Sequence, residues 1–360
     1  MKRFSLLGIV LVLLVALVAP AAPAAVAQNG PNLAGIKGYA LDQASHMKTA
    51  TEAFAAISQT YYDRIAELSE QYPDENPYEY FWNEHPDEVV ATIDSLREQW
   101  FEASLRYELN EGIVAGVPSL SYYDLLLDAG PSKEEDSEEA LEWTLVLPDG
   151  TELESPGNLF THLSEPALYG TVDAYVALDT DLNGNGEIEL SEVMPEANFL
   201  LGVALRLDEE TANLLTAIEE WDPTLEDAFT ALVIMLPTMN EYFEQWKLSS
   251  FVTGGGSEQI SFVAVSRLFD VAGILHGLDV TYDQVGPLIE GIDPDLHAQI
   301  DSGFEDLVTY VTNLYEQEQA GVVFTPEEAD ALGTEAQDKG QTLAALVAQA
   351  AFKLGLELEL

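Results

Sequence analysis

Apolar residues recur at helical spacing through most of this chain, and this period restricts it to a largely α-helical fold. In one stretch, Leu296, Ile300, Phe304, Leu307 and Val311 stand three or four residues apart, which puts them on one face of a helix. The same period predicts further helices over residues 35–71, 86–115, 208–220, 224–247 and 257–291. It also recurs from Leu343 to Leu354, and Thr325 followed by Pro326 predicts the start of another helix. Helices of these lengths pack as antiparallel bundles. We therefore predict an all-α fold of two antiparallel helical bundles of the four-helix type.

One segment breaks the helical period. Residues 143–153 alternate between apolar and polar side chains around a Pro148-Asp149-Gly150 turn, which is typical of a β-hairpin. We predict that this hairpin is a small insertion in an N-terminal helical lobe over residues 28–220. A C-terminal helical lobe is expected over residues 221–360.

The N-terminus has the pattern of a secretory signal peptide. Lys2 and Arg3 precede an apolar run from Leu6 to Ala19, and Ala25-Val26-Ala27 forms a cleavage signature. We predict that residues 1–27 are removed and that the protein is secreted or periplasmic; a retained membrane anchor is the alternative. The sequence contains no cysteine, so it has no lipid-attachment cysteine and no disulfide framework.

The chain is strongly acidic, with a formal net charge of −51 at pH 7. Charge of this sign repels phosphate backbones, which excludes nucleic acid as a partner and disfavours anionic membranes. It also concentrates cations near the protein surface. Solubility or adaptation to salt is the simpler explanation of the charge, so the charge alone assigns no specific role.

The most specific local signal is the segment 181–192, which matches a twelve-residue EF-hand calcium loop. Loop positions 1, 3, 5, 6, 7, 9 and 12 are filled by Asp181, Asn183, Asn185, Gly186, Glu187, Glu189 and Glu192. Helices are predicted before the loop, over residues 171–178, and after it, over residues 191–206. Because the loop is single and two of its ligands are neutral, we expect weak, structural calcium binding in the range of about 0.1 to 1 mM. A polar loop that binds nothing is the alternative.

A second group of residues suits a different metal. His162 and Glu165 are three residues apart, Glu108 and Glu111 have the same spacing, and Asp128 follows them. On a helix this spacing puts both members of a pair on one face. One imidazole with several carboxylates suits iron, manganese or zinc. On spacing alone, a His/Glu pair of this kind usually belongs to an ordinary helix surface.

These residues also carry a resemblance to a known family. The segment Phe160-Thr161-His162-Leu163-Ser164-Glu165 is similar to the Gly-x-His-x-x-Glu motif of the imelysin-like proteins, which include the EfeO component of bacterial iron uptake, although Asn158-Leu159-Phe160 replaces the usual glycine context. Residues 107–111 resemble the Tyr-Glu-x-Ile-Glu stretch of that family, and Asp128 falls near a recurrent aspartate. In the C-terminal third, the resemblance rests on residues 269–272, 287–289, 293–294, 300–304 and 324–330.

The resemblance extends over roughly residues 35–355 and implies a definite architecture. It implies two four-helix bundles with a metal-binding cleft between or beside them. The candidate ligands that it implies are His162, Glu165, Glu108, Glu111 and Asp128. The calcium loop is an insertion that this family does not require.

Two functions compete at this stage. The first is an extracytoplasmic protein that captures iron or another divalent metal and passes it to a membrane iron-uptake complex. The second is a calcium-stabilised binding or scaffold protein of the cell envelope that has no transition metal, its cleft being free to hold a polysaccharide. Some relatives are labelled peptidases, but the sequence has no His-Glu-x-x-His motif, so we do not expect an enzyme.

Overall fold

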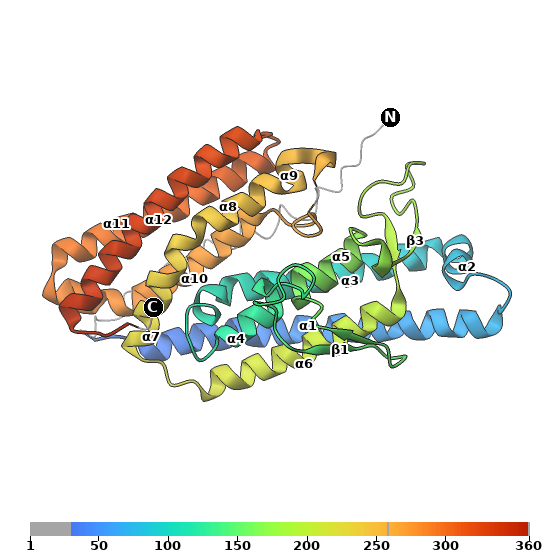
Figure 1. Cartoon of the computed structure of the whole chain (residues 1–360), viewed down its shortest axis with the longest axis horizontal. Helices are drawn as coiled ribbons and strands as arrows, with labels where there is room; N and C mark the ends of the chain where they lie inside the picture. Colours follow the sequence, from blue (N-terminus) through green and yellow to red (C-terminus); the bar gives the residue numbers. More distant parts are fainter. Residues whose placement is uncertain (1–29, 258, 359–360) are drawn as a thin grey trace.

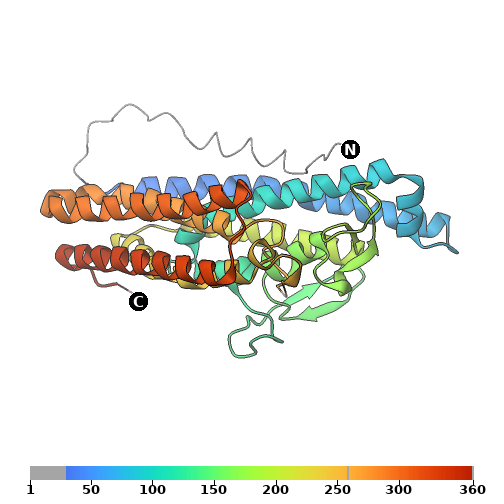
Figure 2. The same cartoon turned by 90° about the horizontal axis from the view of Figure 1, so that it is seen from above.

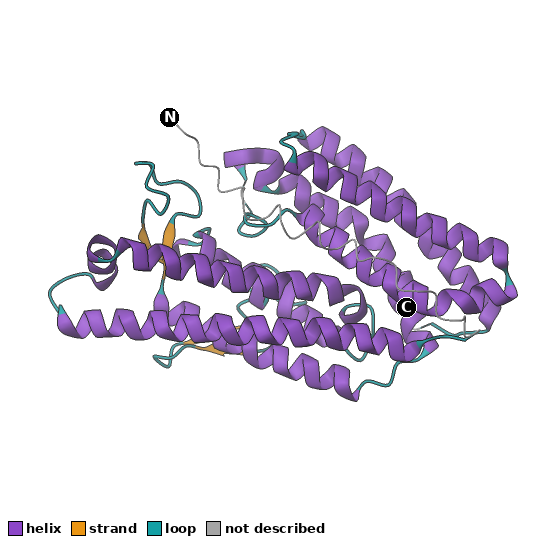
Figure 3. Cartoon of the chain, turned by 180° about the vertical axis from the view of Figure 1, so that it is seen from behind, coloured by secondary structure: helices purple, strands orange, loops and turns teal. Residues whose placement is uncertain are grey.

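The computed structural model describes residues 30–257 and 259–358, so the predicted signal peptide, residues 1–27, lies outside the described residues. The described chain is mostly helical, with two small pairs of strands, as Figure 3 shows. The predicted all-α fold is confirmed. In the same ranges, no helix combines the length and the apolar character that crossing a membrane requires.

Three long helices form the body of the N-terminal lobe. The first of them, α1, packs against both α3 and α6, and α2 lies against the end of α1. Four short helical segments complete the lobe, and they contact α3, α6 or one another. The long elements and α2 are α1 (Leu33–Gln71), α2 (Pro77–Glu84), α3 (Pro86–Val114) and α6 (Ala197–Glu220). The short ones are α4 (Ser121–Asp124), the π-helix η4 (Leu125–Ala129), the π-helix η5 (Leu159–Ser164) and α5 (Glu165–Tyr169).

The C-terminal lobe is an antiparallel four-helix arrangement. In it, α10 packs on α11, α11 on α12, and α12 on α8. Leu296, Ile300, Phe304, Leu307 and Val311 are all buried, as their spacing predicts. The elements are α7 (Leu225–Met235), the 3-10 helix η7 (Leu236–Thr238), α8 (Met239–Leu248), α9 (Ser250–Thr253), the 3-10 helix η8 (Gly254–Gly256), α10 (Arg267–Ile292), α11 (Pro294–Gln319) and α12 (Pro326–Leu354).

The two lobes meet where α10 packs along α3 (Figure 1). Small residues allow the two backbones to come close. A Cβ atom on Gly277 would lie 2.5 Å from the carbonyl oxygen of Leu109, and one on Gly112 would lie 2.8 Å from the Leu278 side chain. The hydrophobic core continues from one lobe into the other. The packing therefore fixes the position of α10 relative to α3.

The strands form two antiparallel pairs. The predicted hairpin consists of β1 (Thr144–Val146) and β2 (Glu152–Glu154), and it projects from the N-terminal lobe in Figure 2. The second pair is β3 (Val176–Asp179) with β4 (Val193–Pro195), preceded by the 3-10 helix η6 (Asp173–Tyr175).

This second pair corrects a prediction about the calcium loop. The segment 181–192 joins two strands rather than two helices, so the helix predicted over residues 171–178 is wrong, and the helix predicted from Ser191 begins only at Ala197. Pro195 explains the later start, because it has no amide hydrogen and it favours an extended conformation for Met194. Glu196 then caps α6 by accepting hydrogen bonds from the amides of Asn198 and Phe199.

Other predicted helix boundaries also need correction. The helix predicted over residues 224–247 is divided into α7 and α8 by η7, which contains Pro237. The helix predicted over residues 257–291 begins only at Arg267. The predicted segment 208–220 is the second half of α6, and α2 was not predicted, although Asn76 caps it and Pro77 occupies its first position.

Candidate metal centre

Three acidic side chains from two elements meet between the lobes. Glu108 and Glu111 lie one turn apart on α3, and Asp128 comes from the π-helix η4. Each offers one carboxylate oxygen, and these three oxygens all lie within 4.8 Å of one another. Their exposed fractions are 3%, 3% and 6%. The spacing of the oxygens and their burial fit coordination of one metal ion by oxygen ligands.

Two of these carboxylates have an oxygen without a hydrogen-bond donor. Glu108 Oε2 and Glu111 Oε2 are buried and accept no hydrogen bond from the described residues. The other oxygen of Glu111 accepts a hydrogen bond of 2.9 Å from the hydroxyl of Tyr242 on α8. A buried acceptor that stays unpaired costs about 1–3 kcal/mol. A cation bound between these oxygens would remove that cost.

A buried arginine faces the same carboxylates from the C-terminal lobe. Arg267, the first residue of α10, has its Nη1 atom 3.6 Å from Glu108 Oε2 and 3.3 Å from Asp270 Oδ2, and its Nη2 atom 3.9 Å from Asp128 Oδ2. Its guanidinium also lies 4.6 Å from the ring centre of Tyr242. Arg267 therefore supplies positive charge to the cluster from the opposite lobe.

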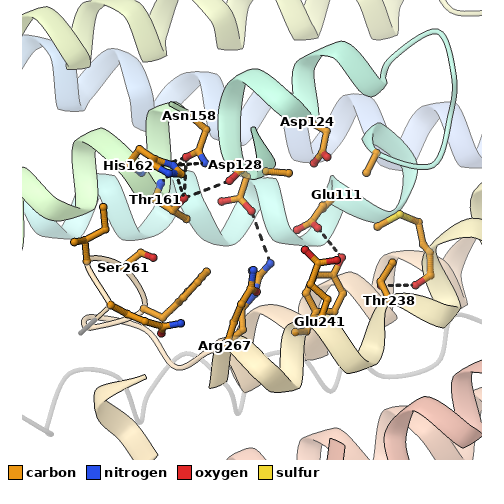
Figure 4. Close-up of a pocket in the computed structure, with 18 of the residues that line it drawn as sticks. Glu111, Asp124, Asp128, Asn158, Thr161, His162, Thr238, Glu241, Ser261 and Arg267 are labelled. Atoms are coloured by element: carbon orange, nitrogen blue, oxygen red, sulfur yellow. Dashed lines mark hydrogen bonds and ion pairs between the residues drawn. The ribbon is translucent and has the colours of Figure 1, made fainter. Parts of the chain in front are cut away.

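Two of the three carboxylates, those of Glu111 and Asp128, line a pocket of about 620 Å³, drawn in Figure 4. Its walls come from both lobes and include three more acidic residues, Asp124, Glu135 and Glu241, as well as Arg267. Most of the ionisable side chains on these walls are therefore acidic. The pocket is large enough to admit a hydrated cation.

Burial has a strong effect on the acidic groups of this cluster. It raises the pKa of Asp128 and of Asp270 to about 7, against the opposing influence of Arg267. Burial and the neighbouring carboxylates raise the pKa of Glu108 well above its ordinary value. The raised values mean that the folded chain holds more acidic groups at this place than one arginine can neutralise. Perturbed groups of this kind, in a pocket, are typical of functional sites.

His162 lies at the edge of the pocket and is already engaged at both ring nitrogens. The amide of Asn158 donates to Nδ1 over 2.8 Å, and Nε2 is 2.5 Å from Glu135 Oε2. Asn158 is held in this orientation because its carbonyl oxygen caps η5 by accepting from the amides of Thr161 and His162. Nε2 therefore carries the proton that His162 donates to Glu135.

Glu165 does not converge with His162. It is 2% exposed, and its carboxylate accepts hydrogen bonds from the amides of Phe262, Val263 and Ala264. Residues three apart share a face on an α-helix, but His162 belongs to a π-helix, whose wider turns do not keep that alignment. The structure thus brings Glu108, Glu111 and Asp128 together, places His162 at the edge of their pocket, and directs Glu165 toward the backbone of another segment.

A family comparison bears on this arrangement. The model of a family described as Imelysin matches residues 38–347, which includes both lobes and every residue of the cluster. The chain belongs to the Imelysin family. A comparison with curated proteins gave no match. The imelysin resemblance predicted from the motifs is therefore confirmed.

The segment 181–192, predicted to be a calcium loop, is folded around its own acidic and amide side chains. Asp181 accepts hydrogen bonds from the amides of Asn185 and Gly186, at 3.0 and 2.7 Å. Glu192 accepts from the amides of Asn183 and Glu189, at 3.0 and 2.9 Å. The first and last acidic residues of the segment therefore both turn inward, while β3 and β4 bring its two ends together.

Sequence reasoning missed two residues of the candidate site. Arg267 and Asp270 stand more than a hundred residues after the carboxylates that they approach, and a lone arginine at the start of a helix carries no local signal. The segment 269–272 contributed to the family resemblance, but nothing in it indicated a place beside Glu108. The packing of α10 on α3 creates that proximity.

Proposed function

We propose that this imelysin-family protein captures iron or another divalent metal ion outside the cytoplasm for uptake, and that it carries a structural calcium site. The observation that supports capture most directly is the group formed by Glu108, Glu111 and Asp128, two of which have buried oxygens without a donor. The acidic pocket leading to it favours entry of a cation. The expected extracytoplasmic location rests on the signal-peptide pattern in residues 1–27.

The ligand chemistry supports a hard or borderline metal. Three carboxylates suit iron or manganese, and an added imidazole extends the range to zinc. His162 would join through Nε2 as the Nδ1–H tautomer, which requires loss of its hydrogen bond to Glu135 and of the contact in which the Asn158 amide donates to Nδ1. The carboxylates would therefore make the first contacts with the metal. A membrane iron-uptake complex is the proposed recipient.

Hydrolysis is not part of this proposal. The sequence has no His-Glu-x-x-His motif, and the lone pocket histidine pairs with a surface glutamate rather than with a nucleophile.

Removing two ligands tests metal capture. In the variant Glu108→Gln/Glu111→Gln, affinity for Fe²⁺ or Mn²⁺ is expected to fall at least about 100-fold, because two anionic ligands become neutral. Metal content after purification without chelator, measured by mass spectrometry, gives the result. His162→Ala is expected to weaken binding about 10-fold.

The matched control is Glu102→Gln, also on α3, where the carboxylate pairs with Arg106 rather than with the cluster. Its metal content should equal that of the wild type. Tight binding that survives in the double variant would contradict the proposed ligands. A wild-type protein that retains calcium alone would favour a calcium-stabilised scaffold or binding protein instead.

The calcium site has a separate test. Calcium at about 100 times its dissociation constant is expected to add about 2.7 kcal/mol to the unfolding free energy. Glu192→Gln should abolish that gain, because the last loop position supplies two ligand oxygens. Glu187→Gln is the matched control, since position 7 contributes its backbone carbonyl and the side chain is exposed. Chemical unfolding of the wild type and both variants, with calcium and with chelator, measures these effects. Identical unfolding curves of the wild type in calcium and in chelator would refute the calcium site.

A further inference from the structure

Glu165 holds three successive backbone amides of a segment nearly a hundred residues away. Its Oε2 accepts from the amide of Phe262 at 3.0 Å, and its Oε1 accepts from the amides of Val263 and Ala264 at 2.9 and 3.1 Å. The carboxylate is buried, so these hydrogen bonds are shielded from water. Successive backbone amides that donate to one carboxylate form a specific and directional binding site for it.

The held segment has an unusual backbone conformation. Phe262 has a φ angle of +55°, in the left-handed region that side chains other than glycine rarely adopt. Such a conformation persists only when the surrounding contacts impose it. The amide of Phe262 is one of the three bound by Glu165, and the hydroxyl of Thr171 donates to the carbonyl oxygen of Ile260. Contacts from α5 and from Thr171, two residues after its end, therefore fix the segment 260–264.

The same segment leads directly to the arginine of the cluster. The ring of Phe262 lies 4.8 Å from the guanidinium of Arg267, and Ser266 caps α10 through the amide of Leu268 at 3.3 Å. Arg267 in turn faces Glu108 and Asp128. A continuous set of contacts thus runs from Glu165 through Phe262 to Arg267 and on to two of the three candidate ligands.

We propose that Glu165 is a positioning residue for the metal centre, which acts by fixing the segment 260–264 and thereby the place of Arg267 against Glu108 and Asp128. This inference rests on the proposed metal capture and assigns Glu165 a role other than that of a ligand. Arg267 bridges two carboxylates that would otherwise repel each other, so its correct placement keeps their oxygens close together. Residues behind the ligands typically change metal affinity without touching the metal.

The test measures Mn²⁺ affinity through the electron paramagnetic resonance signal of the free ion. Glu165→Gln replaces an accepting oxygen by an NH₂ group that faces an amide donor, and Mn²⁺ affinity is expected to fall about 10- to 100-fold. The spectrum of bound Mn²⁺ should stay unchanged, because the ligands are the same. Combining Glu165→Gln with Arg267→Lys should add little to the loss from either change, since both act through the same guanidinium.

Two controls separate positioning from general damage. Glu196→Gln removes a carboxylate that also accepts two backbone amides, but at the start of α6, and it should leave Mn²⁺ affinity unchanged. In metal-free protein, amide hydrogen exchange at residues 262–264 should accelerate in Glu165→Gln and in the milder Glu165→Asp, which shows release of the segment without reference to metal.

The outcomes distinguish this inference from the proposed function. Tight Mn²⁺ binding that is unchanged in Glu165→Gln overturns the inference and leaves capture intact. An altered spectrum of bound Mn²⁺, like that of Glu108→Gln, also overturns it, because Glu165 would then be a ligand. Fully additive losses with Arg267→Lys overturn it as well. A wild-type protein without Mn²⁺ or iron affinity refutes the proposed function. Independently of metal, amide exchange at residues 262–264 that is unchanged in Glu165→Gln refutes the claim that Glu165 fixes the segment 260–264.

Discussion

Arg267→Met is expected to lower the unfolding free energy of the metal-free protein by about 3–5 kcal/mol, because it removes one partner from a buried ionic cluster. The guanidinium lies within 4 Å of carboxylate oxygens of Glu108, Asp128 and Asp270, and each of these side chains is almost fully buried. Without Arg267, the acidic groups must either stay charged without a counter-ion or bind protons. Urea unfolding at pH 8 measures the change.

The matched control is Arg64→Met, in which the arginine pairs with two exposed glutamates on the N-terminal lobe. Exposed pairs contribute about 1 kcal/mol or less, so this change should have a small effect. Added Mn²⁺ should return part of the stability lost in Arg267→Met. A loss no larger than that of the control would contradict the view that Arg267 compensates the charge of the cluster.

The second large effect is on pH dependence: the metal-free protein is expected to lose stability as the pH rises from 5.5 to 8. The pKa is raised to about 7 at Asp128 and Asp270 and to about 6 at Asp279, in each case chiefly by burial. In the unfolded chain an aspartate has a pKa near 3.9, so the folded state binds more protons in this window. Stability then falls with pH, by up to about 1.4 kcal/mol per pH unit for each such group. The loss starts above the unfolded pKa and ends once the pH exceeds the folded pKa.

Carboxylates with lowered pKa values act in the opposite direction, but at more acidic pH. Hydrogen bonds hold the pKa of Asp293 and of Glu328 below their ordinary values, so these groups are already ionised in both states above pH 5.5. Urea unfolding across the window should therefore give a falling curve, and Asp128→Asn/Asp270→Asn should flatten it. A wild-type stability that rises from pH 5.5 to 8 would contradict the assignment.

The helical frame of this protein could be predicted because its signals are local. The apolar face of α11 follows from a repeat within a few turns, and the start of α12 follows from Thr325 and Pro326, which form a cap and a first turn as their types predict. Breaks within helices were harder to place. Pro237 lies where one predicted helix is interrupted, whereas Pro287 lies inside a helix that continues past it. The presence of a proline therefore did not show whether a helix would break.

The site shows the same division between local and distant information. Glu108 and Glu111 could be paired from their spacing because α3 is a regular α-helix there, whereas the equal spacing of His162 and Glu165 falls where a π-helix gives way to α5. Long-range packing decides the rest. Packing brings Asp128 next to α3 and Arg267 next to both Asp128 and α3. It also turns Glu165 toward the backbone of the segment that precedes α10.

The close backbone contact between α3 and α10 has a mechanical consequence. With Gly277 against the Leu109 carbonyl and Gly112 against Leu278, little side-chain volume separates the helices that carry Glu108, Glu111 and Arg267. Helices that pack this closely cannot move apart without breaking the core packing of both lobes. Many ligand-binding proteins trap their cargo by hinged closure of two domains. Here the packing of α3 on α10 already fixes the frame of the candidate site, so under the proposed function we expect loading and unloading of a metal ion to depend on side chains at the pocket mouth.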